Sequence, residues 1–206
     1  MKTESVVSDG NIKLGRTPNV SLLPGETCPE HCKCREKCYA NKATRRPSVF
    51  RKWAANTALW KSDPREFERQ IMVYCEKRRP EFFRWQVAGD IPDVNYLRMM
   101  IRVACRFPDT KFLAFTKRYD HFASDKSVIT REDWAIPDNL TVVLSGWPDY
   151  RRDQWAFAAG VYPIAWVNLE EGGETFLGSF KCPGKCESCR HCWGMVAGEC
   201  VEFEEH

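Results

Sequence analysis

Residues 82–118 decide the fold of this chain, and they read FFRWQVAGDIPDVNYLRMMIRVACRFPDTKFLAFTKR. The apolar runs at 82–90 and 111–118 predict two strands, and apolar residues at helical spacing predict an amphipathic helix over 92–107. Near-continuous apolar strands that alternate with helices are typical of a parallel sheet with helices packed outside it. We therefore predict an α/β protein.

The same alternation continues on both sides of this unit. Ser62 or Asp63 can cap the helix predicted at 65–79, and Pro64 suits its first turn. Five or six strands are too few for an eight-stranded barrel, so we predict a partial parallel (βα) barrel or an open parallel sheet, in a single domain over 1–206. The other predicted elements are a strand at 19–25, helices at 48–60, 65–79 and 150–160, a polar loop at 119–139, and strands at 140–147, 162–169 and 174–180.

The composition is that of an ordinary globular protein. Of the 206 residues, 43% are hydrophobic and 29% are charged, so a disordered tail is excluded. No apolar run reaches the ~18–20 residues of a membrane helix, so no membrane partner is expected. The polar start, MKTESVVSDG, lacks the apolar core of a signal peptide, and we expect a cytoplasmic location.

Eight of the eleven cysteines gather in two short loops. In a reducing compartment such loops are more often metal sites than disulfide frameworks. Cys75 and Cys105 fall on the apolar side of predicted helices, where we expect buried thiols. The first loop spans 28–38 and the second spans 182–192, and their candidate metal ligands are Cys28, Cys32, Cys34, Cys38, Cys182, Cys186, Cys189 and Cys192.

The spacing favours an iron–sulfur cluster over zinc. Structural zinc usually takes two Cys-x2-Cys pairs separated by a dozen or more residues, and neither loop has that pattern. The second loop reads Cys-x3-Cys-x2-Cys-x2-Cys, which is as dense as a cluster loop. We expect one or two [4Fe–4S] clusters, with zinc as the alternative. A single cluster with ligands from both loops stays open.

Polar residues follow the predicted strands at the edge where catalytic groups of parallel sheets gather. Asp90 is a candidate to hold a ligand amine, and Lys117 and Arg118 are candidates to bind a carboxylate, a phosphate or a cluster. Because the first loop follows the first strand and the second loop follows the last, we expect both loops at this same edge.

The first loop, CKCREKCYAN, resembles the cluster loop of radical S-adenosylmethionine proteins, in which an aromatic residue often follows the last cysteine. More closely, the chain resembles phage-encoded proteins of unknown function that are named for a mycobacteriophage gene product. That likeness spans about residues 15–195. It rests on four short motifs: Cys38-Tyr39-Ala40, Ala88-Gly89-Asp90, Phe115-Thr116-Lys117-Arg118 and Cys192-Trp193.

The resemblance implies a radical-S-adenosylmethionine-like partial barrel with an iron–sulfur cluster at its carboxyl mouth, in the host cytoplasm. In an enzyme of that kind, Cys28, Cys34 and Cys38 would hold the cluster that meets substrate, and the second loop an auxiliary cluster or zinc. Asp90, Lys117 and Arg118 would be the catalytic residues. S-adenosylmethionine would be bound by Gly89, Asp90, Thr116 and Ser145.

Two other functions stay open. A non-catalytic iron–sulfur protein would transfer electrons or sense redox state, and it would need an electron donor. The other hypothesis is a nucleic-acid-binding module with structural metal. It rests on the stretch KATRRPSVFRKW (42–53), whose basic residues lie among aromatic ones. The net charge of +3 is too small to demand such a partner, and a small-molecule ligand is equally compatible with it.

Overall fold

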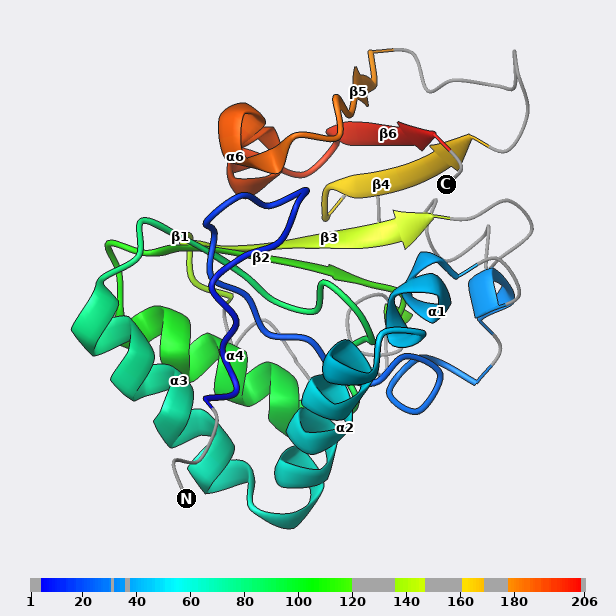
Figure 1. Cartoon of the computed structure of the whole chain (residues 1–206). Helices are drawn as coiled ribbons and strands as arrows, with labels where there is room; N and C mark the ends of the chain where they lie inside the picture. Colours follow the sequence, from blue (N-terminus) through cyan, green and yellow to red (C-terminus); the bar gives the residue numbers. More distant parts are fainter. Residues whose placement is uncertain are drawn as a thin grey trace.

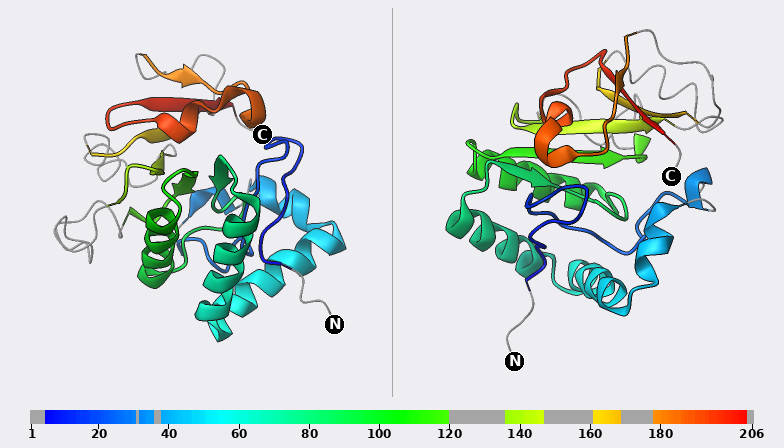
Figure 2. Two further views of the ribbon diagram at one scale, coloured as in Figure 1. Left: turned by 90° about the vertical axis from the view of Figure 1, so that its left-hand side faces the viewer. Right: turned by 45° about the horizontal axis from the view of Figure 1, so that its top comes forward.

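The computed structural model of the chain describes residues 5–30, 32–35, 38–119, 136–146, 161–168 and 178–204 (Figure 1). Its centre is a six-stranded sheet in which every pair of neighbouring strands is parallel. The sheet curls into a half-barrel (Figure 2). The strand order is β1-β2-β3-β4-β6-β5, with β1 at Phe82–Arg84, β2 at Lys111–Thr116, β3 at Leu140–Gly146, β4 at Ile164–Asn168, β5 at Phe180–Lys181 and β6 at Cys200–Glu204.

The three long helices, α2, α3 and α4, lie on one side of this sheet (Figure 1). Helices α3 and α4 lie beneath β1 and β2, and α2 lies beside them (Figure 1). We call this side the helix face and the opposite side, lined by Leu113, Val143, Ala165 and Val201, the inner face. The helical elements are η1 at Lys33–Arg35, α1 at Tyr39–Thr44, α2 at Pro47–Ser62, α3 at Pro64–Arg78, α4 at Val94–Arg106, α6 at Cys186–Cys189 and η3 at His191–Gly194. The prediction of a partial parallel barrel is therefore confirmed.

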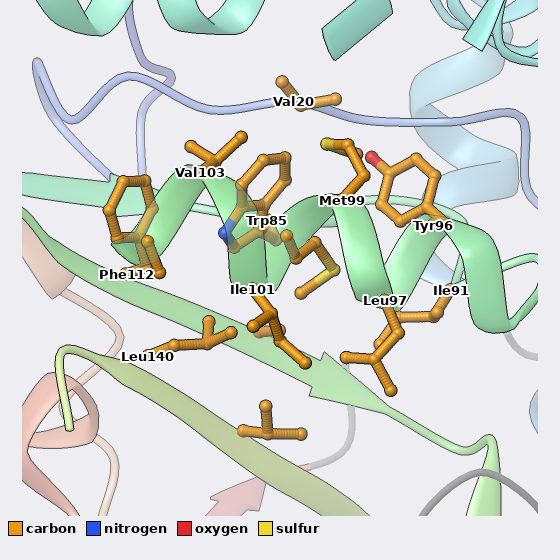
Figure 3. Packing of buried hydrophobic residues seen from close by; sticks show 14 of the residues in the cluster. Val20, Trp85, Ile91, Tyr96, Leu97, Met99, Ile101, Val103, Phe112 and Leu140 are labelled. Carbon is orange, nitrogen blue, oxygen red and sulfur yellow. The ribbon is translucent and has the colours of Figure 1, made fainter. Parts of the chain in front are cut away.

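The main core lies between the helix face and α3 and α4 (Figure 3). Trp85 and Phe112 stack with their ring centroids 6.0 Å apart, and Tyr96 meets Trp85 edge-on at 6.2 Å. Leu97 of α4 is also fully buried. Each such side chain contributes about 1.5–3 kcal/mol by leaving water, so this core holds β1 and β2 in place.

Aspartate side chains cap the amino ends of α3 and α4. The Oδ1 atom of Asp63 accepts a hydrogen bond from Glu66 N at 3.0 Å, and Pro64 occupies the first turn, as predicted. Asp93 Oδ1 caps α4 in the same way, at 2.9 Å from Tyr96 N. The predicted helices at 48–60, 65–79 and 92–107 are confirmed within three residues at each end.

The first predicted strands are shorter than expected. The strand at 82–90 ends at Arg84, because Gln86 adopts a left-handed backbone with φ 40° that breaks the pleat. The segment at 19–25 is an extended stretch beside β1, with Val20 N donating to Arg84 O at 3.1 Å and Leu22 N to Ala88 O at 3.0 Å.

The carboxyl-terminal part of the chain also departs from the prediction. The strand β6 was not predicted, yet it lies between β4 and β5. Of the strand expected at 174–180, the described part is β5 at Phe180–Lys181, and the helix expected at 150–160 lies outside the described residues.

Two remaining expectations concern burial. Cys75 is fully buried in the core, as predicted, but Cys105 is exposed, so that prediction was wrong. The buried stripe of α4 runs through Leu97, Ile101 and Ala104, and Cys105 lies one residue beyond it, about 100° around the helix.

No helix in the described ranges is long and apolar enough to cross a membrane.

Candidate functional site

Asp90 joins two strand ends at the carboxyl edge of the sheet. Its Oδ1 atom accepts hydrogen bonds from the Thr116 hydroxyl and, at 2.7 Å, from Ile91 N. Its Oδ2 atom accepts from Lys117 N at 2.9 Å. The side chain is 5% exposed, and burial raises the pKa of Asp90 although these donors favour the charged form. The carboxylate thus connects the segment after β1 with the end of β2.

Gly89 lets the chain turn into this position. Its φ is 75°, a conformation that side chains with a Cβ rarely adopt. A Cβ here would lie 2.6 Å from Thr27 Oγ1 and 2.8 Å from Leu22 O. The same Thr27 Oγ1 accepts a hydrogen bond from Asp90 N at 3.1 Å. Glycine therefore allows the start of the first cysteine loop to pack directly against the backbone of Asp90.

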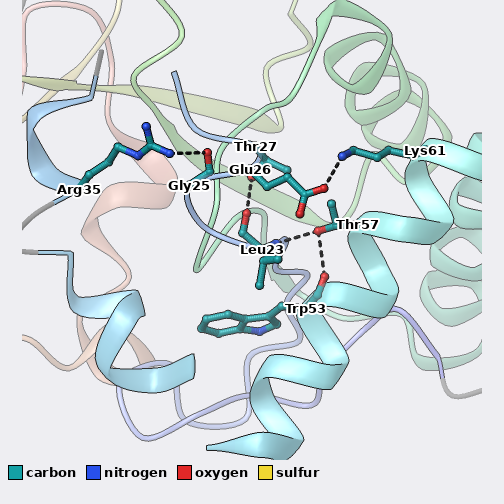
Figure 4. Close-up of polar contacts among 8 residues, drawn as sticks. All are labelled: Leu23, Gly25, Glu26, Thr27, Arg35, Trp53, Thr57 and Lys61. Atoms are coloured by element: carbon teal, nitrogen blue, oxygen red, sulfur yellow. Dashed lines mark hydrogen bonds and ion pairs between the residues drawn. The ribbon is translucent and has the colours of Figure 1, made fainter. Parts of the chain in front are cut away.

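Polar contacts fasten the first loop to α2 (Figure 4). Leu23 N donates to Thr57 Oγ1 at 2.8 Å, and Thr27 Oγ1 donates to Leu23 O at 3.1 Å. From the loop, the Arg35 guanidinium donates to the O atom of Gly25, in the segment before it, at 3.3 Å. An ion pair between Glu26 and Lys61 of α2 is a further link between this segment and the helix. These contacts hold the first loop at the carboxyl edge.

Two sulfur atoms of the first loop are in contact. Cys32 Sγ and Cys34 Sγ lie 2.8 Å apart and share a hydrogen bond. This bond lowers the pKa of Cys34 to about 6 and raises that of Cys32, and the nearby Lys117 ammonium favours the thiolate as well. Burial raises the pKa of Cys28 to about 11, with smaller contributions from Cys34 and Cys38. Cys32 and Cys34 therefore act on each other, and the charges of Cys34 and Cys38 act on Cys28.

Lys117 is within electrostatic reach of both the first loop and the strand-end carboxylate. Burial lowers its pKa, but the negative forms of Cys34, Cys32 and Asp90 outweigh this effect and leave the pKa above its ordinary value. Lys117 is therefore a cation that faces the sulfur atoms. The sequence-based prediction of Asp90, Thr116 and Lys117 as neighbours is confirmed, and the first loop lies beside them.

The second loop does not reach this edge, so the expectation of a shared edge was wrong. It packs on the inner face near the starts of the strands, as Figure 1 shows for α6. Trp193 Nε1 donates to Phe83 O at 3.1 Å, and Trp193 O accepts from the Thr141 hydroxyl at 3.0 Å. The Phe82 and Trp193 rings meet edge-on at 5.6 Å. Burial of this large ring decides where the loop lies.

Arg84 lies within electrostatic reach of Tyr39, which follows the first loop, and of cysteines of the second loop. The Arg84 guanidinium carbon is 4.0 Å from the centre of the Phe115 ring, on the inner face. Its charge acts on Cys186 and Cys192, whose pKa values are raised by burial, that of Cys192 to about 12. The Tyr39 hydroxyl donates to Val87 O. The sequence analysis did not single out Arg84, although an arginine inside an apolar strand is unusual and could have marked it as a candidate site residue.

The remaining predicted site residues lie at the ends of neighbouring strands. Arg118 N donates to Thr116 Oγ1 at 3.0 Å, and Ser145 O accepts from the Tyr119 hydroxyl at 2.6 Å. Their assignment to a cofactor or to catalysis stays a prediction.

The donor set of each loop has the right chemistry for a soft metal centre, with four thiols in eleven residues. Within the described ranges, no three histidine, cysteine or acidic side chains are close enough to enclose a metal ion. No contact between a sulfur of one loop and a sulfur of the other is present among those residues. Each loop would therefore have to draw its own thiols together around a metal.

Comparison with known proteins identifies a family for most of the chain. The family model described as Gene product 88 matches residues 4–167, which include the first loop, Asp90 and Lys117. The match ends before the second loop, although the expected likeness extended to about residue 195. It supports the expected phage origin. No curated protein and no solved structure matches the chain. The chain therefore belongs to the Gene product 88 family.

Proposed function

We propose that this protein binds an iron–sulfur cluster in its first cysteine loop, at the carboxyl edge of a half-barrel. One observation carries the proposal: the loop that contains Cys28, Cys32, Cys34 and Cys38 lies at the edge where parallel sheets bind ligands, with Cys28 and Cys34 within electrostatic reach of Asp90. A disulfide framework or an inert core would not require four free thiols at such a place.

The surroundings of these thiols support metal ligation. A ligating cysteine must be a thiolate, and the pKa of Cys34 is already lowered to about 6. Lys117 places a positive charge where a thiolate-bound cluster would bring negative charge. When bound, a [4Fe–4S] cluster would supply one-electron transfer, while Asp90 and Thr116 would keep Lys117 in place beside it.

The number of cysteine ligands separates two versions of this function. In the radical-S-adenosylmethionine-like version, Cys28, Cys34 and Cys38 hold the cluster, Asp90 holds the cofactor amine, and Lys117 or Arg118 holds its carboxylate. In the electron-transfer version, Cys32 is the fourth ligand. Two observations favour the latter: Cys32 lies next to Cys34, and both carboxylate oxygens of Asp90 already accept hydrogen bonds.

Metal analysis and spectroscopy test the proposal. Protein purified without oxygen should contain about four irons and four sulfides for each cluster. Electron paramagnetic resonance of the reduced protein should be recorded with and without S-adenosylmethionine. An unchanged spectrum means full cysteine ligation, and a changed spectrum means an open iron and the enzymatic version. Zinc without iron, after reconstitution with iron and sulfide, overturns both versions.

The basic stretch supports a second candidate function, binding of nucleic acid. Lys42, Arg45, Arg46 and Arg51 are exposed around the start of α2, and Phe50 beside them is 46% exposed. No ion pair of the described residues involves these four cations. Because α2 has no acidic residue in its first turn, its positive amino end adds to their charge.

This candidate is tested by titrating labelled single-stranded DNA at several salt concentrations. If all four cations contact phosphates, the logarithm of the binding constant should fall with the logarithm of salt concentration at a slope of about −3. Replacing Arg45, Arg46 and Arg51 by glutamine should weaken binding and flatten that slope. Unchanged binding by this variant would remove the candidate, and replacing the exposed Arg106 is the control.

A further inference from the structure

The first turns of α2 carry an exposed aromatic ring. Phe50 is 46% exposed, and its ring stacks on no other aromatic side chain in the described part of the chain. The neighbouring residues Pro47, Ser48 and Arg51 are exposed as well. Because a single exposed phenylalanine is common on protein surfaces, the meaning of this ring depends on the groups that surround it.

Those surroundings are basic and contain no acidic residue. Residues 38–62 include six lysines and arginines and no aspartate or glutamate, although the whole chain has 31 basic and 28 acidic residues. Two of the six are engaged elsewhere, since Lys61 pairs with Glu26 and Lys52 donates to Ser5 O. The other four are exposed and form no ion pair with any described residue: Lys42, Arg45, Arg46 and Arg51. This surface suits a partner with several negative charges.

The ring lies among these cations. Phe50 N donates to Arg46 O at 3.0 Å, so the ring and Arg46 are one helical turn apart, and Arg51 follows Phe50 directly in the chain. A partner that binds these arginines therefore also meets the face of an aromatic ring.

The helix that carries the ring is anchored to the rest of the protein. Asn56 Nδ2 donates to Val6 O and to Ser21 O, each at 3.0 Å, and Thr57 Oγ1 accepts from Leu23 N (Figure 4). These contacts lie in the second half of α2, and the exposed positions lie in its first turns. The ring is thus presented on a rigid support, which lowers the entropy lost when a ligand packs against it.

We propose that this end of α2 binds single-stranded nucleic acid, with an unpaired base stacked on Phe50 and phosphates bound by the four free cations. The proposal rests on the second candidate function above and names its partner more narrowly. In a duplex the base faces cover one another, so only an unpaired base can stack on a protein ring. Helix α1 follows Cys38 directly and is about 9 Å long, so a bound strand would lie near the first loop.

The test is fluorescence anisotropy of the whole chain with three labelled probes at low salt: a short oligothymidine, an abasic strand of the same length, and a duplex. Wild-type protein should bind the oligothymidine about 5- to 100-fold more tightly than the abasic strand, the range that corresponds to one base–aromatic stack. Phe50→Ala should lose most of this difference, and Phe50→Trp should keep it. The affinity for the duplex should be the same in all three proteins.

Phe180→Ala is the matched control, because Phe180 is also an exposed phenylalanine, 37% exposed, but lies in β5 at the other edge of the sheet. It should bind all three probes like the wild type. Phe50→Ala is expected to fold, since the side chain is exposed and alanine favours helices. Because its phosphate contacts are kept, its binding should retain the wild-type dependence on salt concentration.

Three results would overturn the proposal. If Phe50→Ala still prefers the oligothymidine over the abasic strand as strongly as the wild type does, the ring stacks on no base. If the wild type binds the duplex at least as tightly as the oligothymidine, the partner is double-stranded. If sedimentation shows a wild-type dimer that Phe50→Ala cannot form, while both bind the probes alike, the ring packs against a second copy of the chain.

Failure of the stacking proposal is separate from failure of nucleic-acid binding. Binding that is weakened in the variant with Arg45, Arg46 and Arg51 replaced by glutamine, but is the same in Phe50→Ala as in the wild type, removes only the stacked base. No salt-dependent binding of the wild type to any of the three probes removes both.

Discussion

The two cysteine loops have similar composition and are held in the protein by different forces. Polar contacts fix the first loop, through Thr57 of α2 and through Thr27 at the backbone of Asp90. An aromatic anchor fixes the second, because Trp193 is buried against the inner face. Of the two loops, only the first lies within residues 4–167, which the family model matches. Cysteine spacing thus indicates a kind of chemistry, while the anchoring residues decide where in the fold that chemistry is placed.

The largest expected effect is on metal content. Cys34→Ala should remove the cluster of the first loop, about four irons per chain, because a thiolate ligand is lost. Cys189→Ala should leave those irons bound. The measurement is iron and sulfide analysis of both variants, with Cys105→Ala, an exposed cysteine outside both loops, as the control. Equal loss of iron in both variants would mean one cluster shared by the two loops.

The next effect is on stability. Trp193→Ala should lower the free energy of unfolding by about 3–5 kcal/mol, because a large buried ring and its hydrogen bond to Phe83 O are lost. In the first loop, Tyr39→Phe removes one hydrogen bond to Val87 O and should cost only about 0.5–1.5 kcal/mol. Urea unfolding measures both. Similar costs for the two variants would show that the loops are anchored alike.

A smaller loss is expected at the strand-end carboxylate. Asp90→Asn keeps the shape of the side chain but turns an acceptor into a donor that faces Lys117 N or the Thr116 hydroxyl. The free energy of unfolding should fall by about 1–3 kcal/mol. Asp109→Asn, at an exposed position, is the control and should be neutral within about 0.5 kcal/mol. Equal stability of Asp90→Asn and wild type would contradict a structural role for this carboxylate.

The last difference between the loops is thiol reactivity in the reduced, metal-free protein. Cys34 has a pKa of about 6, so alkylation by iodoacetamide should already be fast at pH 7 and should slow as pH falls through 6. Cys192, with a pKa of about 12, should stay unmodified at pH 7. Mass spectrometry of digested protein over a pH series reads out both sites. Faster alkylation of Cys192 than of Cys34 would contradict the expected difference in thiol reactivity between the two loops.

Much of the site at the carboxyl edge was predictable from local patterns. The strand–helix–strand alternation at 82–118 implied a parallel sheet, and the carboxyl ends of parallel strands meet at one edge. Asp90, Thr116 and Lys117 were therefore expected together, and they are. The first loop follows the extended segment beside β1, so its place at the same edge is a consequence of chain direction.

The parallel sheet, the two thiol-rich loops and the polar strand ends were predictable, because they depend on residue period and on chain direction over short distances. The position of β6 between β4 and β5, the place of the second loop on the inner face and its nearness to Arg84 became visible only in the folded chain. The physical reason is that these placements arise from packing between segments about a hundred residues apart, as between Trp193 and Phe82. Local periodicity carries no signal of which distant surface an aromatic side chain will cover.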